Sequence, residues 1–259
     1  MLRLLKIVRK HRYVLTNFVS RDLKIKYRGT VAGYLWSLLE PLSLVAVYYF
    51  IFGVIAKRGD ADFPLLVILG LLPWNYFNGV IMSSSTALRS NAGLVLRVHL
   101  PRETYILANA ATALVVMGLS LLVIIPFMFV WDVVPGWKLI LFPISILMLS
   151  GFALGLGMVV ACANVIYRDL GYLISVIFRF LFYFSATIYP VSMVPKEFQY
   201  YFLFNPIALC LSMGRNGVMN REMPFEAIHV VSACVLSLLI FALGNWTFPK
   251  LESKAVKYL

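Results

Sequence analysis

Six apolar runs dominate the sequence and leave few folds open to it. A helix that crosses the hydrocarbon core of a bilayer needs about 20 largely apolar residues, and its backbone must satisfy its own hydrogen bonds. A soluble core does not need apolar runs of that length. We therefore predict an all-α integral membrane protein whose single transmembrane domain, residues 1–259, contains six transmembrane helices, at about residues 30–56, 63–88, 104–131, 139–166, 173–189 and 225–248.

The composition agrees with a membrane protein. Hydrophobic residues make up 61% of the chain and charged residues only 13%, whereas soluble domains carry about 25% charged residues. A net charge of +12 would suggest a nucleic-acid partner in a soluble protein. In a membrane protein such an excess instead marks the cytoplasmic face, which meets anionic lipid. We expect membrane lipid and no nucleic acid as a partner.

The positive charges also predict an orientation. Six spans put both termini on one side, and sixteen of the 23 Lys and Arg residues fall in the N-terminal arm, residues 89–103, the YRDL turn and the C-terminal tail. The opposite loops, which include a short polar loop at residues 57–62, hold six. Because basic loops stay in the cytoplasm, both termini are predicted to be cytoplasmic. The first thirty residues contain no continuous apolar core, so no cleavable signal peptide is expected.

Two segments are predicted to be helical without crossing the membrane. Residues 2–20 combine an apolar stripe with a basic face, which suits a helix in the plane of the lipid headgroups, although a soluble partner could use the same face. Residues 190–218 contain two apolar pieces, 196–204 and 206–218, that prolines separate. Each piece is too short to cross. They form either a re-entrant pair that dips into the outer leaflet or an interfacial hairpin.

The sequence contains no recognisable catalytic or metal-binding motif. It has no GxxxxGK[ST] loop for ATP, no HExxH or GxSxG, and no cluster of His and Cys at metal spacing. Cys162, Cys210 and Cys234 are isolated, which favours buried thiols over a disulfide or a metal site. We expect no enzyme activity, catalytic residue, metal or cofactor of its own. An intramembrane enzyme that acts on lipid-linked sugars remains the alternative from another class.

Two charged residues, Glu40 and Arg179, lie about ten residues inside predicted spans, where a charge is costly unless it meets water or a partner. One interpretation is a neutralising ion pair that joins the first and fifth spans. The other interpretation is a polar pathway, because each charge shares a helix side with polar or aromatic residues at a spacing of three to four. These residues are Trp36, Ser37 and Ser43 for Glu40, and Ser175, Phe182 and Tyr183 for Arg179.

An aromatic cluster at residues 178–184 surrounds Arg179 in the sequence. It is either lipid-facing bulk or a surface on which sugar rings stack.

Residues 89–103 have the form of a docking segment. A short helix from Gly93 to Leu100, ended by Pro101, would present Leu94, Arg97 and Val98 to the cytoplasm. A plain connecting loop is the alternative.

Four motifs occur in an order that resembles a known family. They are RDLKIKYRGTVAGYLWSLLEPL at 21–42, LVLRVHLPRE at 94–103, YRDLGY at 167–172, and YPVSMVP at 189–195 with NP at 205–206. Together they resemble the membrane subunits of ABC transporters that export polysaccharides, most of all the Wzm-type O-antigen permeases. Capsule and teichoic acid permeases are related, and a drug or lipid exporter of the same permease class is the runner-up within transport.

The resemblance implies a homodimer in the bacterial inner membrane, paired with two copies of a separate ATPase that binds ATP and Mg. It implies that residues 89–103, with Leu94, Arg97, Val98 and Arg102, couple to the ATPase beside the interface helix 2–20, and that residues 190–218 gate the external end. The first and fifth spans would line the channel. The substrate would be a glycan on a polyprenyl pyrophosphate. Its negatively charged head group would be bound by Lys24, Lys26 and Arg28. The alternative is that these three residues only anchor the chain to membrane lipid.

Overall fold

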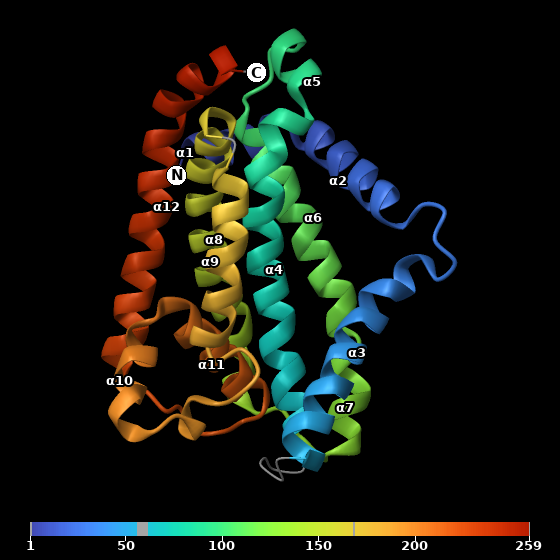
Figure 1. Cartoon of the computed structure of the whole chain (residues 1–259), viewed down its shortest axis with the longest axis vertical. Coiled ribbons are helices and arrows are strands. Elements are labelled where there is room, and N and C mark those ends of the chain that lie inside the picture. The colour runs from blue at the N-terminus through green and yellow to red at the C-terminus, as the bar shows by residue number, and fades with distance from the viewer. Residues whose placement is uncertain (1, 56–61, 168, 259) are drawn as a thin grey trace.

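The computed structural model describes residues 2–55, 62–167 and 169–258, and all regular structure in these ranges is helical (Figure 1). The predicted all-α class is confirmed. Residue 56, most of the predicted 57–62 loop and residue 168 of the YRDL turn lie outside the described residues. The helices are α1 (Leu2–Lys10), α2 (Arg12–Tyr27), α3 (Trp36–Tyr49), α4 (Phe63–Ser90), α5 (Ala92–Arg97), α6 (Glu103–Leu121), α7 (Ile124–Val130), α8 (Leu141–Ile166), α9 (Leu170–Phe184), α10 (Lys196–Phe204), α11 (Pro206–Val218) and α12 (Ala227–Ala255).

Five helical stretches in the described residues are long and apolar enough to cross a membrane: Gly33–Ile55, Phe63–Ser90, Glu103–Val130, Trp137–Ile166 and Ala227–Tyr258. The remaining predicted span, 173–189, corresponds to α9, which has 15 residues. At 1.5 Å per residue α9 is about 22 Å long, less than the roughly 30 Å of a bilayer core. The predicted number of six spans is therefore not confirmed.

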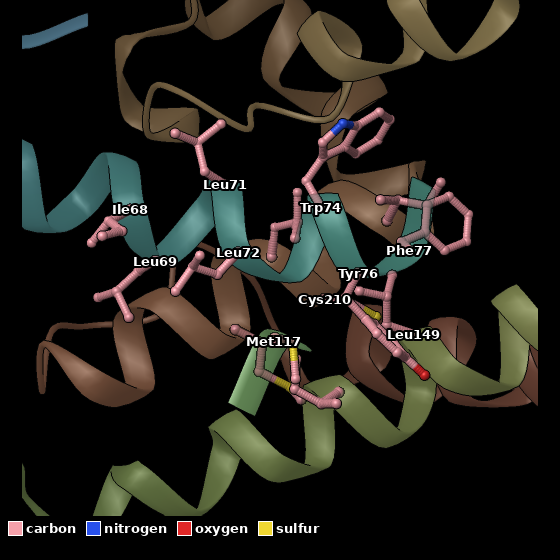
Figure 2. Packing of buried hydrophobic residues seen from close by; sticks show 14 of the residues in the cluster. Ile68, Leu69, Leu71, Leu72, Trp74, Tyr76, Phe77, Met117, Leu149 and Cys210 are labelled. Carbon is pink, nitrogen blue, oxygen red and sulfur yellow. The ribbon is translucent and has the colours of Figure 1, made fainter. Parts of the chain in front are cut away.

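Helix α4 forms the centre of the bundle. In its most apolar window 78% of the residues are buried, against 11% for the span that contains α3. It is apolar around most of its circumference and packs on α3, α6, α8, α9 and α11, as expected of a helix in the middle of a bundle. Figure 2 shows Leu71 and Trp74 on one side of α4 and Leu69 and Leu72 on the other, toward Met117 of α6 and Leu149 of α8.

Glycines allow α8 and α12 to approach closely. A Cβ added to Gly155 would lie 2.6 Å from the carbonyl carbon of Ile240, and one added to Gly244 would lie 2.7 Å from the Cα of Gly155. The Ser237 hydroxyl also donates a hydrogen bond to the Met148 carbonyl at 2.6 Å. Small residues at such a contact permit the backbone packing that stabilises helix pairs in lipid.

The N-terminal segment is two helices, not the single helix expected at 2–20. The chain turns at His11, and α2 continues to Tyr27. In α1 the side chains of Leu4 and Ile7 are buried in a cluster with residues of α4, α6 and α8, and Arg3 Nη2 lies 2.7 Å from the buried Glu103 Oε1 of α6. Leu4 and Ile7 of the apolar stripe thus contact protein, whereas Val8 is exposed, and the position of this segment in the plane of the headgroups stays a prediction.

The proline-rich segment forms the two short helices that the sequence predicts, α10 and α11, at the end of the bundle opposite both chain termini (Figure 1). Arg215 of α11 is fully buried, and its guanidinium donates hydrogen bonds to the carbonyls of Ala186, Thr187 and Tyr189 at 3.2, 2.7 and 3.0 Å. Gly70 of α4 makes room for this contact, because a Cβ there would collide with Arg215 and the Thr187 carbonyl. Arg215 therefore closes the turn that follows α9.

Candidate functional site

A cavity of about 530 Å³ lies between the end of α2 and helices α3, α4 and α6. We call it the amide cavity. Its wall follows one stripe of each helix, so lining residues recur at intervals of three or four. The cavity includes Ser37, Glu40 and Lys26 from the predicted sets, and polar residues that the sequence analysis did not assign to a site: Asp22, Asn75, Tyr76, Asn78, Ser83, Asn109, Thr112 and Ser120.

Hydrogen bonds divide the polar lining of the amide cavity into two groups. The hydroxyls of Ser37, Tyr76, Ser83 and Ser120 bond to protein atoms; Ser120, for example, donates to the Ser37 carbonyl at 2.8 Å and so joins α6 to α3. Within the described part of the chain, the side chains of Asn75, Asn78, Asn109 and Thr112 make no hydrogen bond. Asn78 Oδ1 and Thr112 Oγ1 are, in addition, closed off from solvent.

A second cavity of about 520 Å³ lies between α3, α4 and α9. We call it the aromatic cavity. It brings together four residues predicted on α9, and its lining is Tyr48, Trp74, Asn78, Met82, Ser175, Phe178, Arg179, Phe182 and Tyr183. The predicted aromatic cluster divides between two environments. Phe178 and Phe182 pack on Trp74, with ring centroids 6.0 and 5.6 Å from its ring, whereas Phe180 and Phe184 point outward and are more than 60% exposed.

Glu40 and Arg179 are not joined by an ion pair within 4.0 Å anywhere in the described structure. Glu40 lines the amide cavity and Arg179 the aromatic cavity, and both side chains are exposed. The neutralising pair considered from the sequence is therefore not formed within one chain.

Trp36 and Ser43, which the sequence placed beside Glu40, line neither cavity. Trp36 is 50% exposed, and the Ser43 hydroxyl donates to the Glu40 carbonyl at 2.8 Å.

The basic residues near the end of α2 fall on two sides of that helix. Lys24 and Arg28 line a groove of about 360 Å³ with Arg21, Asn17 and Ser20. Lys26 lies on the other side and lines the amide cavity, because residues two apart do not share a helix face. The three residues predicted to bind one head group are therefore not brought together.

The predicted docking helix in residues 89–103 is α5, which begins one residue earlier and ends three residues earlier than expected. It forms the tip of the molecule, at the end that holds both chain termini (Figure 1). Val95 anchors it, whereas Leu94, Arg97 and Val98 are exposed as predicted. Arg102 differs from these three, because its guanidinium is half-buried and forms an ion pair with Glu252 of α12.

Curated relatives resemble the chain along most of its length. It is 28% identical over 250 residues to the O-antigen export system permease protein RfbA of Klebsiella pneumoniae, a match that covers 95% of each chain. It is 30% identical over 197 residues to the RfbA permease of Myxococcus xanthus, 76% of each chain. The polysialic acid transport protein KpsM of Escherichia coli is 24% identical over 208 residues, 77% of this chain and 78% of that one. The ABC-2 type transporter family model matches residues 14–219, and the chain belongs to that family.

Proposed function

We propose that this chain is the membrane subunit of a transporter that exports a lipid-linked polysaccharide of the O-antigen type across the bacterial inner membrane. Its similarity to O-antigen export permeases over 95% of both chains carries the proposal. The aromatic cavity supports it, because the C–H faces of sugar rings stack on aromatic rings and the exposed Arg179 adds a donor beside them. A capsule polysaccharide is the alternative cargo, favoured by the similarity to a polysialic acid transport protein, and a teichoic acid is a further one.

The proposed assembly contains two copies of this chain and two ATPase subunits that bind ATP and Mg. Helices α3 and α9 support the dimer, since each leaves a wide apolar face uncovered in the single chain. The exposed tip of α5 supports docking of the ATPase, and it lies at the same end as both chain termini, which we propose to be cytoplasmic. The groove around Lys24 and Arg28 would attract the pyrophosphate of a polyprenyl carrier; attraction of membrane lipid is the alternative.

Replacing Arg179 tests the transport path. In a strain that lacks the chromosomal copy, we expect Arg179→Ala to abolish surface glycan and Arg179→Lys to retain part of it, because lysine keeps the charge but loses the planar fork of donors. Surface glycan is measured by immunoblot or by lectin binding. The deletion strain complemented with the wild-type chain is the reference. Full export by the Ala variant would remove Arg179 from the path, and normal surface glycan in the deletion strain itself would overturn the proposed function.

The double substitution Leu94→Glu with Val98→Glu tests the docking helix. It places two charges on an apolar patch that is already exposed, so we expect no loss of stability and at least a tenfold loss of ATPase bound to the purified chain. Co-purification from membranes measures the complex. Tyr258→Glu is the control, because Tyr258 is also exposed and lies beside the C-terminus, at the same end of the bundle as α5. Equal recovery of the ATPase from the double variant would assign docking to another surface.

A further inference from the structure

Unpartnered polar groups gather in the amide cavity at membrane depth. Asn75 and Asn78 lie near the middle of the 28-residue α4, and Asn109 and Thr112 face them from α6. None of the four side chains forms a hydrogen bond in the part of the chain that the structure describes. An unpaired polar atom at this depth costs free energy, and Asn78 Oδ1 and Thr112 Oγ1 are also closed off from solvent. The gathering of four such side chains in one cavity indicates a ligand.

We propose that the amide cavity is a second binding site for sugar units of the transported glycan, beside the aromatic cavity, with which it shares Asn78. The proposal rests on the proposed function and names a part of the chain that meets the cargo. Each amide side chain has hydrogen-bond donors and an acceptor, and each sugar hydroxyl is both a donor and an acceptor. Amides can therefore form hydrogen bonds with a sugar without a charged group on either side. Leu72, Val116 and Met117 supply apolar lining for the C–H faces of a ring.

The lining excludes two other classes of ligand. The charged residues of the cavity are Asp22, Lys26 and Glu40, two acids against one base, which disfavours a phosphate or pyrophosphate. A lipid tail would leave the four polar side chains unpaired. The volume of about 530 Å³ lies within the range of roughly 300–1,000 Å³ that small-molecule sites occupy.

Replacing the amides with leucine separates binding from folding. Asn75→Leu with Asn109→Leu keeps side chains of similar size and removes two unpartnered amides that line the amide cavity but not the aromatic cavity. We expect an unchanged or higher melting temperature together with at least a tenfold loss of surface glycan. A purely structural role would lower both. Asn245→Leu is the matched control, because its side-chain Oδ1 also lacks a hydrogen-bond partner but lies on α12, outside both cavities. We expect this control to export normally.

The variant Gly79→Cys reports occupancy of the amide cavity directly. Gly79 lines that cavity, and a Cβ there meets nothing within 4 Å. Cys234→Ser removes the exposed native thiol, while Cys162 and Cys210 stay buried. With the transporter and its ATPase reconstituted in vesicles, we expect a maleimide to label the Gly79→Cys variant. Polyprenyl pyrophosphate that carries the host's glycan should slow labelling at least fivefold, and the same lipid without sugar should not.

The outcomes distinguish the site from the function. Normal export by the double leucine variant, no labelling at position 79, or equal protection by the sugar-free lipid would each overturn the sugar site while leaving the exporter intact. A deletion strain that exports glycan normally would instead overturn the exporter, and the site with it.

Discussion

Arg215→Met is expected to lower the free energy of unfolding by on the order of 3–5 kcal/mol, because it leaves three carbonyls of the turn after α9 without their donor. Methionine fills most of the space but donates nothing. Since whole domains are stable by only about 5–15 kcal/mol, the variant should be recovered from membranes in much smaller amounts. Thermal unfolding of the purified chain in detergent measures the change.

The matched control for Arg215 is Arg97→Met. Arg97 is exposed on α5, and the same change of side chain there should alter the free energy of unfolding by less than about 0.5 kcal/mol. Arg215→Lys should fall between the two, because an ammonium keeps the charge but cannot span three carbonyls. A melting temperature of Arg215→Met equal to that of the wild type would mean that the carbonyls find other donors.

Gly244→Ala is expected to destabilise the chain by about 1–3 kcal/mol, and more if the helices cannot move apart. The added Cβ would lie 2.7 Å from Gly155 Cα and 2.8 Å from its carbonyl carbon, and both are backbone atoms. Relief therefore requires α8 and α12 to separate along their contact. Thermal unfolding in detergent, with recovery from membranes as a second readout, measures the loss.

Gly118→Ala, in contrast, should not lower the free energy of unfolding. Gly118 is also inside a helix, α6, but an added Cβ there meets nothing within 4 Å. Alanine is favoured over glycine in a helix by about 1 kcal/mol, so Gly118→Ala should be neutral or stabilising. If both alanine variants melt at the same temperature, the close approach of α8 and α12 does not contribute to stability.

Local signals predicted the fold class and many boundaries. The apolar runs predicted α4 and α8 to within a few residues, and the prolines that bracket 196–204 and 206–218 predicted α10 and α11. The end of α9 could not be predicted in this way. It ends at Phe184 and not Tyr189, because Ala186 adopts a left-handed φ of 50°, and the turn is held by Arg215, which is 29 residues further along the chain. No nearby residue signals that contact.

The candidate site was predictable only along single helices. Spacing of three to four placed Ser37 with Glu40 and Ser175 with Arg179, and these pairs do share cavities. The same rule applied to α6 would have found Asn109 with Thr112. Spacing cannot tell which helices face each other, so it could not separate Glu40 from Arg179 or Lys26 from Lys24. Those separations depend on how α2, α3 and α9 are oriented around α4.

The contact between Arg215 and the turn after α9 also couples the ordering of two segments. The carbonyls of Ala186, Thr187 and Tyr189 precede Arg215 by 29, 28 and 26 residues. Until α11 packs beside them they must bond to water or to other donors, because an unpaired carbonyl is costly in lipid. We therefore expect the turn after α9 and helix α11 to become ordered together.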